Sequence, residues 1–158
     1  MADQITPSDA LVETWHLNNR VNLRLLDALT DEQLAAAIFP RGKSVISYFV
    51  HIHMARFYWL ERRAPALARN LKKIPGEKAP RAVVRQALID SGAAMGEMFA
   101  EAARTGTLKG VKRGPVAFLG YALAHEGHHR GQILLHLKVA KLPVDRATGY
   151  SLWYWNAI

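Results

Sequence analysis

Apolar residues recur at helical spacing along four long segments of the chain, and no segment shows the alternating pattern of a half-buried strand. The segments run from Pro7 or Ser8 to Leu29, from Ser44 to Arg63, from Arg81 to Arg104 and from Pro115 to Ala140. Stretches with proline and glycine, which interrupt helices, separate them. The pattern therefore predicts an all-α protein built as a four-helix bundle.

Polar residues and glycines interrupt two of these helices on faces that would otherwise pack. Asn19 and Asn22 lie on the same stripe as Trp15 in the first segment. Gly92 and Gly96 fall within the third segment, where the missing side chain permits a close approach to a neighbour. The second segment is apolar on nearly all sides, as expected of a helix that is surrounded by others.

The connections carry signals of their own. Thr30 is followed three residues later by Gln33, the spacing of a capping box, which predicts a short helix. The loop 64–80 has three prolines and a basic bias, and we expect one helical turn at residues 66–71. An aromatic cluster at residues 153–155 is expected to pack against the bundle, because exposed groups of large apolar side chains are uncommon.

Composition limits the chemistry that is available. A chain of 158 residues fits one domain, 1–158, and buries roughly 70% of its unfolded surface. The chain has no cysteine, so disulfides, thiolate nucleophiles and sulfur ligands are excluded, and histidine and carboxylate are the strong metal ligands that remain. It shows neither a signal-peptide pattern nor an apolar run of ~20 residues, so we expect a cytoplasmic protein without a membrane partner.

The formal net charge of +8 would suit a polyanionic partner. The basic residues, however, gather in two stretches, 69–81 and 108–114, without interleaved aromatic residues. Isolated basic loops of this kind usually form a solvated surface. We therefore do not expect a nucleic-acid partner.

Histidines concentrate in the fourth segment. His125 and His129 are four residues apart, so their side chains lie one turn above the other, close enough to share one cation. Gln132 and His136 continue the same stripe, which makes this face too polar for a plain core, whereas His128 points about 100° away from His129. The pair predicts two ligands of a metal site.

A third ligand is needed, because catalytic zinc and nickel sites typically use three protein groups. The second segment offers His51 and His53 among aromatic and aliphatic residues, where an unpaired imidazole is costly to bury. Since the two histidines are two residues apart, they point to different faces of the helix. Only one of them can face the bundle centre together with the pair, and periodicity does not decide which one.

The stretch from His125 to His129 also matches the H-E-x-x-H signature of zinc hydrolases, in which Glu126 would act as general base. No substrate-binding strand is expected beside it, however, and only His136, on the same helix, follows as a third ligand. We therefore disfavour this interpretation. The remaining histidine, His16, is expected at the boundary between core and surface.

The fourth segment resembles a motif of a known family. The string HEGHHRGQILLHLKVAKLP closely resembles the fourth-helix motif of the DinB/YfiT-like superfamily, whose most recognisable part is His-x-x-x-His-Arg-Gly-Gln. Further resemblance lies, in chain order, in NNRVNLRLLDAL, SVISYFVHIHMARFYWLE and TGYSLWYWN. The resemblance thus covers nearly the whole chain in the right order.

This resemblance implies a four-helix bundle in up-down-down-up order, often a homodimer. It also implies a divalent cation that is held by one histidine of the second helix and two of the fourth. His125 and His129 match the motif pair, and His51 matches the second-helix ligand, because Trp59 and Leu60 follow it at the corresponding distance. Some members of the family are thiol-dependent transferases that use low-molecular-weight thiols, and others are isomerases or resemble hydrolases.

Two functional hypotheses follow. In the first, a three-histidine site binds zinc or nickel in a metal-dependent transferase or hydrolase that acts on a small molecule, with a low-molecular-weight thiol as co-substrate. In the second, the protein is a non-catalytic dimeric stress-response or ligand-binding bundle in which the metal is structural. Neither hypothesis assigns a catalytic side chain.

Outer partners of the ligands are expected as well, because ligating imidazoles usually donate their other N–H to a nearby acceptor. The candidates are Gln132, Glu126 and the two amides Asn19 and Asn22. For Arg130 and Gln132 the alternative is a structural role, in which they bind helix ends or a partner subunit.

Overall fold

Four long helices carry the apolar segments in the computed structural model, which describes residues 5–39, 42–74 and 79–158. They are α1 (Pro7–Ala28), α3 (Val45–Arg63), α5 (Arg81–Thr105) and α6 (Gly114–Val139), each close to its predicted bounds. Across these described residues no strand is present, and extended pairing is limited to an isolated bridge between Ala37 and Ser44. The predicted all-α class is confirmed.

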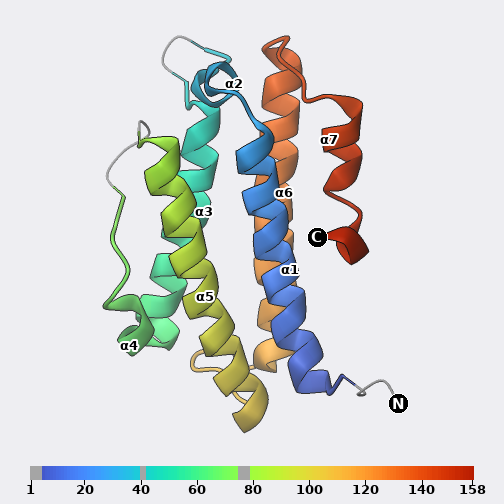
Figure 1. Cartoon of the computed structure of the whole chain (residues 1–158). Coiled ribbons are helices and arrows are strands. Elements are labelled where there is room, and N and C mark those ends of the chain that lie inside the picture. The colour runs from blue at the N-terminus through green and yellow to red at the C-terminus, as the bar shows by residue number, and fades with distance from the viewer. Residues whose placement is uncertain (1–4, 40–41, 75–78) are drawn as a thin grey trace.

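The long helices lie side by side along most of their length (Figure 1). α1 and α6 run in one direction, while α3 and α5 run in the opposite direction. α1 packs against α5 and α6, and α3 packs against the same two helices. The two helices that carry the histidines of interest, α3 and α6, are therefore direct neighbours.

The residue that caps the start of α1 is Thr6, which the sequence pattern did not indicate. The Thr6 hydroxyl accepts a hydrogen bond from the backbone N–H of Asp9 at 3.1 Å and so caps α1. The predicted start at Pro7 is confirmed, and the alternative start at Ser8 is wrong. Pro7 occupies the first helical position, which suits its fixed φ angle and missing N–H, and this leaves the preceding residue as the cap.

A capping box begins the short helix α2 (Asp31–Ala35), as predicted. The Thr30 hydroxyl accepts the backbone N–H of Gln33, and the Gln33 side chain accepts the backbone N–H of Thr30. In the loop after α3, one further turn, α4 (Pro65–Ala68), starts one residue before the predicted turn. Residues 75–78 of this loop lie outside the described residues.

Apolar side chains gather in two clusters, one toward each end of the long helices. The cluster beside α2 includes Leu25, Phe49, Leu88, Ile133 and Leu137. The cluster beside α4 includes Trp15, Leu60, Met95, Phe99 and Phe118. All four long helices contribute to both clusters, so burial of these side chains holds the helices together. Among the described helices, none has the length and apolar character needed to cross a membrane.

A buried ion pair lies between the two clusters. Arg56 of α3 and Glu126 of α6 are fully buried, and they meet through two hydrogen bonds, Nε to Oε1 at 2.7 Å and Nη2 to Oε2 at 2.8 Å. Asn18 and Asn22 of α1 each donate to Glu126 Oε2 at 2.6 Å. Arg56 also donates to Asn19 Oδ1 at 2.8 Å. The charges are thus paired and bonded, as burial requires.

Arg130, one turn beyond Glu126, completes this arrangement. Its Nη1 donates to Asn18 Oδ1 at 2.9 Å and to Asn22 Oδ1 at 2.7 Å. These bonds support the structural role expected of Arg130, but the acceptors are side-chain amides in the middle of α1 rather than helix ends. We call this set the buried polar layer, and it consists of Asn18, Asn19, Asn22, Arg56, Glu126 and Arg130.

Two glycines of α5 allow α1 to come close, as predicted. A Cβ atom at Gly92 would collide with the side-chain amide of Asn19, and one at Gly96 would lie 2.5 Å from His16 Cε1. The Gly92 carbonyl also accepts a hydrogen bond from Trp15 Nε1 at 2.8 Å. His16 is partly exposed, which confirms its predicted place at the boundary.

The aromatic tail does not pack as the sequence suggests. After the short helix α7 (Arg146–Ser151), Leu152 is buried and Trp155 packs against the cluster beside α2, but Trp153 is 79% exposed and Tyr154 is 62% exposed. The prediction for these two residues is wrong. Leu152 and Trp155 take the inward positions of this segment, and the two residues between them face outward.

Replacing Glu126 by glutamine is expected to lower the free energy of unfolding by about 3–5 kcal/mol, because the Arg56 guanidinium would stay buried without a counter-charge. Urea denaturation followed by circular dichroism measures this loss. The matched control is Asp27→Asn, which breaks a half-exposed ion pair with Arg85 and should cost less than about 1 kcal/mol. Equal losses in the two variants would contradict the structural role of the buried polar layer.

Candidate metal centre

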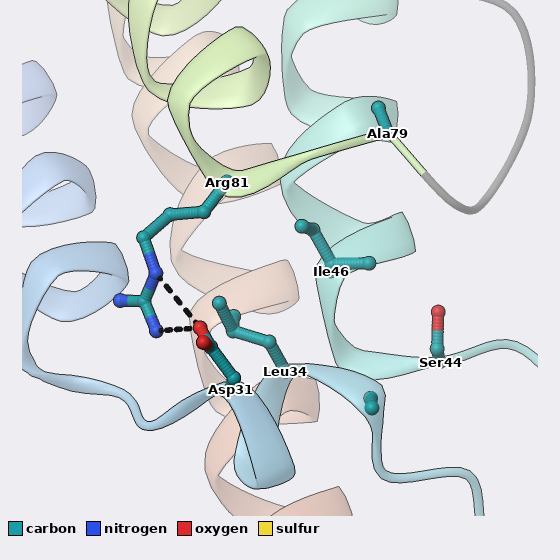
Figure 2. A pocket seen from close by; sticks show the side chains of 7 residues that line it. Asp31, Leu34, Ser44, Ile46, Ala79 and Arg81 are labelled. Carbon is teal, nitrogen blue, oxygen red and sulfur yellow. Dashed lines mark hydrogen bonds and ion pairs between the residues drawn. The ribbon is translucent and has the colours of Figure 1, made fainter.

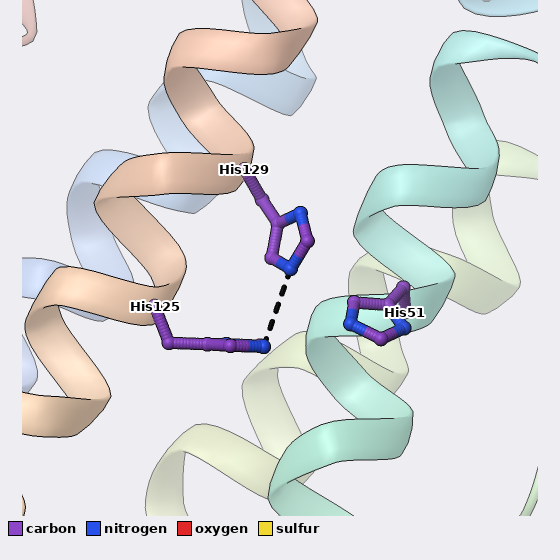
Figure 3. A group of neighbouring side chains, drawn as sticks. All are labelled: His51, His125 and His129. Carbon is purple, nitrogen blue, oxygen red and sulfur yellow. Dashed lines mark hydrogen bonds between the residues drawn. The ribbon is translucent and has the colours of Figure 1, made fainter.

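Three imidazoles from two helices meet between α3 and α6. His51 of α3 and the pair His125 and His129 of α6 each offer a ring nitrogen, and these nitrogens all lie within 4.8 Å of one another. Figure 3 shows the three rings turned toward a common space between the two helices. The Nε2 atoms of His125 and His129 are 3.2 Å apart. The structure thus brings together the three residues predicted as ligands.

The cluster lies on the outer side of the helix pair. In Figure 3 the ribbons of α1 and α5 lie behind α3 and α6, and His51 is exposed while the other two rings are half-buried. The expectation that the ligands face the bundle centre is therefore wrong. The centre is filled by the buried polar layer, which takes the inward faces of α3 and α6 at Arg56 and Glu126.

The structure decides between the two histidines of α3. The His53 ring is buried between two backbone carbonyls, with Nδ1 at 3.0 Å from the Ala87 oxygen and Nε2 at 2.8 Å from the Lys72 oxygen. Burial lowers the pKa of His53, and the two carbonyls act in the opposite direction. This histidine ties α3 to α5 and the preceding loop, so His51 is the residue that joins the pair.

Gln132 holds the ring of His129. Its Oε1 lies 2.8 Å from His129 Nδ1, so this nitrogen donates the hydrogen bond and Nε2 presents its lone pair to the cluster. Of the candidates for outer partners, Gln132 therefore contacts a cluster histidine. Glu126 and the amides of Asn19 and Asn22 do not, because they belong to the buried polar layer.

Aromatic rings close one side of the cluster. The ring centroid of His125 lies 5.1 Å from that of Trp59 and 6.2 Å from that of Tyr121. His125 Nδ1 is buried and has no hydrogen-bond partner among the residues that the structure describes. On the other side, Tyr48 lies between His129 and the buried ring of His136, with ring centroids 6.3 and 5.9 Å away. The rings are thereby held in place by packing.

All three cluster histidines favour the neutral form. Burial is the first cause that lowers the pKa of His51, His125 and His129, and nearby imidazoles lower it further. Lys43 acts in the same direction on His51 and His129. Neutral imidazole is the form that binds metal ions, so the electrostatics of the cluster favour the metal-binding form at neutral pH.

The donor set fits a divalent cation. Imidazole nitrogens at ~2.1 Å from a tetrahedral cation lie roughly 3.4 Å apart, close to the spacing of the two α6 nitrogens. His51 is near enough to join them through a small side-chain movement. Within the described chain, no carboxylate or fourth histidine belongs to this group, so three protein ligands leave further coordination positions to small molecules.

The zinc-hydrolase interpretation of the same stretch is excluded by the place of Glu126. A general base must reach a water or substrate at the metal. Glu126, however, is fully buried, forms an ion pair with Arg56 and accepts hydrogen bonds from α1. It points into the bundle interior, whereas His125 and His129 point toward His51 of α3.

The sequence pattern did not predict the role of Arg56, the residue that pairs with Glu126. A single arginine within an otherwise apolar helix was the available signal, because a fully buried arginine needs a counter-charge. Asn18 was overlooked for a similar reason. It stands next to Asn19, and only the packed structure shows that both amides are buried.

A pocket elsewhere does not involve the histidines. This hollow of about 350 Å³ lies among α2 and the first residues of α3 and α5. Figure 2 shows the side chains that line it. Arg81 donates to Asp31 at 2.7 Å across its edge, and Leu34 and Ile46 form apolar parts of its lining. Its charged groups are already paired, and it offers no metal-ligating cluster.

Comparison with known protein families gives a match over most of the chain. The sequence model of the DinB family matches residues 1–140 of the chain. A search among curated proteins finds no match to the chain. The matched range extends from α1 through α6 and includes all three cluster histidines.

The buried His136 side chain should contribute to the pH dependence of stability. Burial lowers the pKa of this residue below the unfolded value of about 6.5. The unfolded state therefore binds the proton first, and stability falls as the pH drops through 6.5 toward the lower folded pKa. In His136→Leu this contribution is absent, so the unfolding free energy should fall less between neutral and mildly acidic pH. Urea denaturation at a series of pH values measures this free energy. An equal fall with pH in the variant and the wild type would contradict the assignment.

Proposed function

Because the chain belongs to the DinB family, we propose that His51, His125 and His129 bind one divalent cation and that the protein is a metal-dependent enzyme acting on a small molecule. The observation that carries this proposal is the convergence of three neutral imidazoles at a partly open site. Zinc or nickel suits an all-nitrogen donor set best, although iron and manganese also bind imidazole.

The open character of the site supports catalysis over a purely structural role. Structural zinc sites usually have four protein ligands, while catalytic sites keep a position for water or substrate. Here three protein ligands are available within the described residues, and His51 is exposed. A small molecule can therefore approach from solvent, while the rings of Trp59 and Tyr121 shield one side from water.

The reaction class that we propose is thiol-dependent transfer, with hydrolysis as the second option. A bound divalent cation would lower the pKa of a coordinating thiol or water. Since the chain has no cysteine, the sulfur would come from a low-molecular-weight thiol as co-substrate. Gln132 orients His129 by accepting its Nδ1–H, and the packed rings keep the other two imidazoles in place.

A non-catalytic dimer is the second candidate, and the outer surface gives it some support. Several large apolar side chains of α6 and the tail are at least half-exposed, and they are Leu135, Val139, Tyr150, Trp153 and Tyr154. Apolar surface of this kind is common at interfaces between subunits. In this alternative the cation would only tie α3 to α6.

The finer fold assignment is part of the same proposal. We assign the chain to the DinB-type four-helix bundle with up-down-down-up order and to one domain. The opposite directions of the pairs α1 and α6 against α3 and α5 support this order (Figure 1). The buried polar layer, to which α1, α3 and α6 all contribute, supports a single folding unit.

Metal analysis tests the proposal directly. Protein purified without a histidine tag and loaded with zinc or nickel should hold one equivalent per chain. His51→Ala, His125→Ala and His129→Ala should each weaken binding by more than about 100-fold, which exceeds the usual cost of losing an outer partner. Equilibrium dialysis with elemental analysis measures this. The matched control is His128→Ala, an exposed neighbour that should keep full affinity. Full affinity in all three ligand variants would contradict the proposal.

Gln132→Leu should weaken metal binding by roughly 10–100-fold, because His129 would lose the acceptor that fixes its ring and tautomer. Competition with a chromogenic chelator measures the affinity. Gln132→Glu, which keeps an acceptor at this position, should retain or increase it. If leucine and glutamate variants bind equally well, Gln132 does not act through His129.

A further inference from the structure

A second feature adjoins the histidine cluster at the end of α3 and the start of α6. It is a cleft of about 460 Å³, lined by the last residues of α3, the loop before α6 and the first turns of α6. Trp59 and Tyr121 belong to its lining, and both rings also contact His125. The cleft and the cluster therefore share one wall.

The shared wall consists of aromatic rings. The centroid of Trp59 lies 5.6 Å from those of Phe118 and Tyr121, and the latter two rings stack at 5.9 Å. Tyr121 is 54% exposed, so this surface is open to a ligand. A flat or apolar segment of a small molecule can lie along these rings, with one end at His125 and the other in the cleft.

The cleft is positively charged. Four of its lining residues are cationic, while none is acidic, and the four are Arg62, Arg63, Lys112 and Arg113. In the described part of the chain, none of these four forms an ion pair. Elsewhere arginines find carboxylates, as Arg81 and Arg85 do. A cluster of unpaired cations in one concave site attracts an anion.

Arg63 shows this lack of a counter-charge most clearly. Its guanidinium lies 4.3 Å above the ring of Phe118, and its Nε is buried without a hydrogen-bond partner among the described residues. Burial, followed by the charge of Arg62, lowers the pKa of Arg63. An oxyanion between these side chains would supply the missing acceptors and charge.

The start of α6 adds to the positive electrostatic potential of the cleft. The helix begins at Gly114, beside the cleft, with no capping side chain and no acidic residue in its first turn. The Gly114 N–H is bonded to the Val111 carbonyl and Pro115 has no N–H, so the start of α6 contributes mainly the positive end of its helix dipole.

From this geometry we infer that the cleft binds an oxyanionic group of the substrate, a carboxylate or a phosphate-like group, while the reacting end of the same molecule reaches the three histidines. The inference rests on the proposed function, since it concerns the substrate class of that site. The substrate is then a small anion with a flat or apolar middle segment, and Arg62, Arg63, Lys112 and Arg113 determine specificity.

A matched pair of probes tests this inference on the zinc-loaded full chain. para-(Mercaptomethyl)benzoate carries a thiol for the metal, a ring for the aromatic wall and a carboxylate for the cleft, and para-(mercaptomethyl)benzamide lacks only the charge. Quenching of tryptophan fluorescence or calorimetry gives both dissociation constants. The benzoate should bind at least about tenfold more tightly. The corresponding phosphonate identifies the preferred oxyanion, and tighter binding of either anion than of the amide supports the inference.

Substitutions in the cleft test whether its cations cause the preference for the benzoate over the benzamide. Arg63→Gln should reduce the ratio of the two affinities toward one, and Lys112→Gln, at an exposed loop position, should reduce it without a risk to folding. The matched control is Lys138→Gln, an exposed cation in the last turn of α6, which should keep the ratio of the wild type. The zinc content should stay the same in all three variants.

The outcomes separate the cleft from the metal site. Equal affinities for benzoate and benzamide in protein that holds zinc would overturn the inference and leave the metal site intact. If the chain holds no zinc, but para-toluate, which has no thiol, binds and is lost in Arg63→Gln, the cleft is supported and the metal site is contradicted. Tighter binding of generic duplex DNA, lost in the same variant, would assign the cations to a phosphate backbone and overturn the inference.

Discussion

The buried ion pair between Arg56 and Glu126 fixes how α3 and α6 face each other, and the candidate site depends on this orientation. Both side chains point inward, where α1 completes their hydrogen bonds. Asn18 and Asn22 donate to Glu126, and Asn19 accepts from Arg56. In a helix, neighbouring positions differ by about 100°. With residues 56 and 126 turned inward, His51 is about 140° from the inward direction of α3, while His125 and His129 lie about 100° and 60° from the inward direction of α6 and point sideways, toward α3. Alternative rotations of either helix would leave a buried charge without its partner.

This division of faces explains how one pair of helices carries two polar systems with different roles. The inner system has its buried ion pair hydrogen-bonded and is tied to the backbone of α5, as Arg56 donates to the Leu88 carbonyl at 3.1 Å. The outer system has rings with nitrogens left for a ligand and an edge that is open to solvent. A site with spare donors and access suits binding and exchange of small molecules. The cationic cleft adjoins this system at Trp59 and Tyr121 and reaches the start of α6.

Sequence rules that act within one helix predicted much of this. The helix bounds, the capping box at Thr30 and the stacking of His125 over His129 all follow from spacing along the chain. The choice between His51 and His53 could not be made in this way, because both histidines fit the same helix. It depends on the rotation of α3, which a contact with a residue 70 positions away determines. The exposure of Trp153 could not be predicted for a related reason. Three adjacent aromatic residues do not show which of them packs against the bundle, because this depends on how the tail folds back on it.

The central claim is that three imidazoles from α3 and α6 share one cation, and the local structure around a bound metal tests it most directly. X-ray absorption spectroscopy at the metal edge, on protein purified without a tag and loaded with one equivalent of zinc, counts the imidazoles that bind. The account predicts three imidazole nitrogens at about 2.0–2.1 Å and a remaining position filled by a small ligand. A first shell with one imidazole or none, or with four protein ligands, would contradict it.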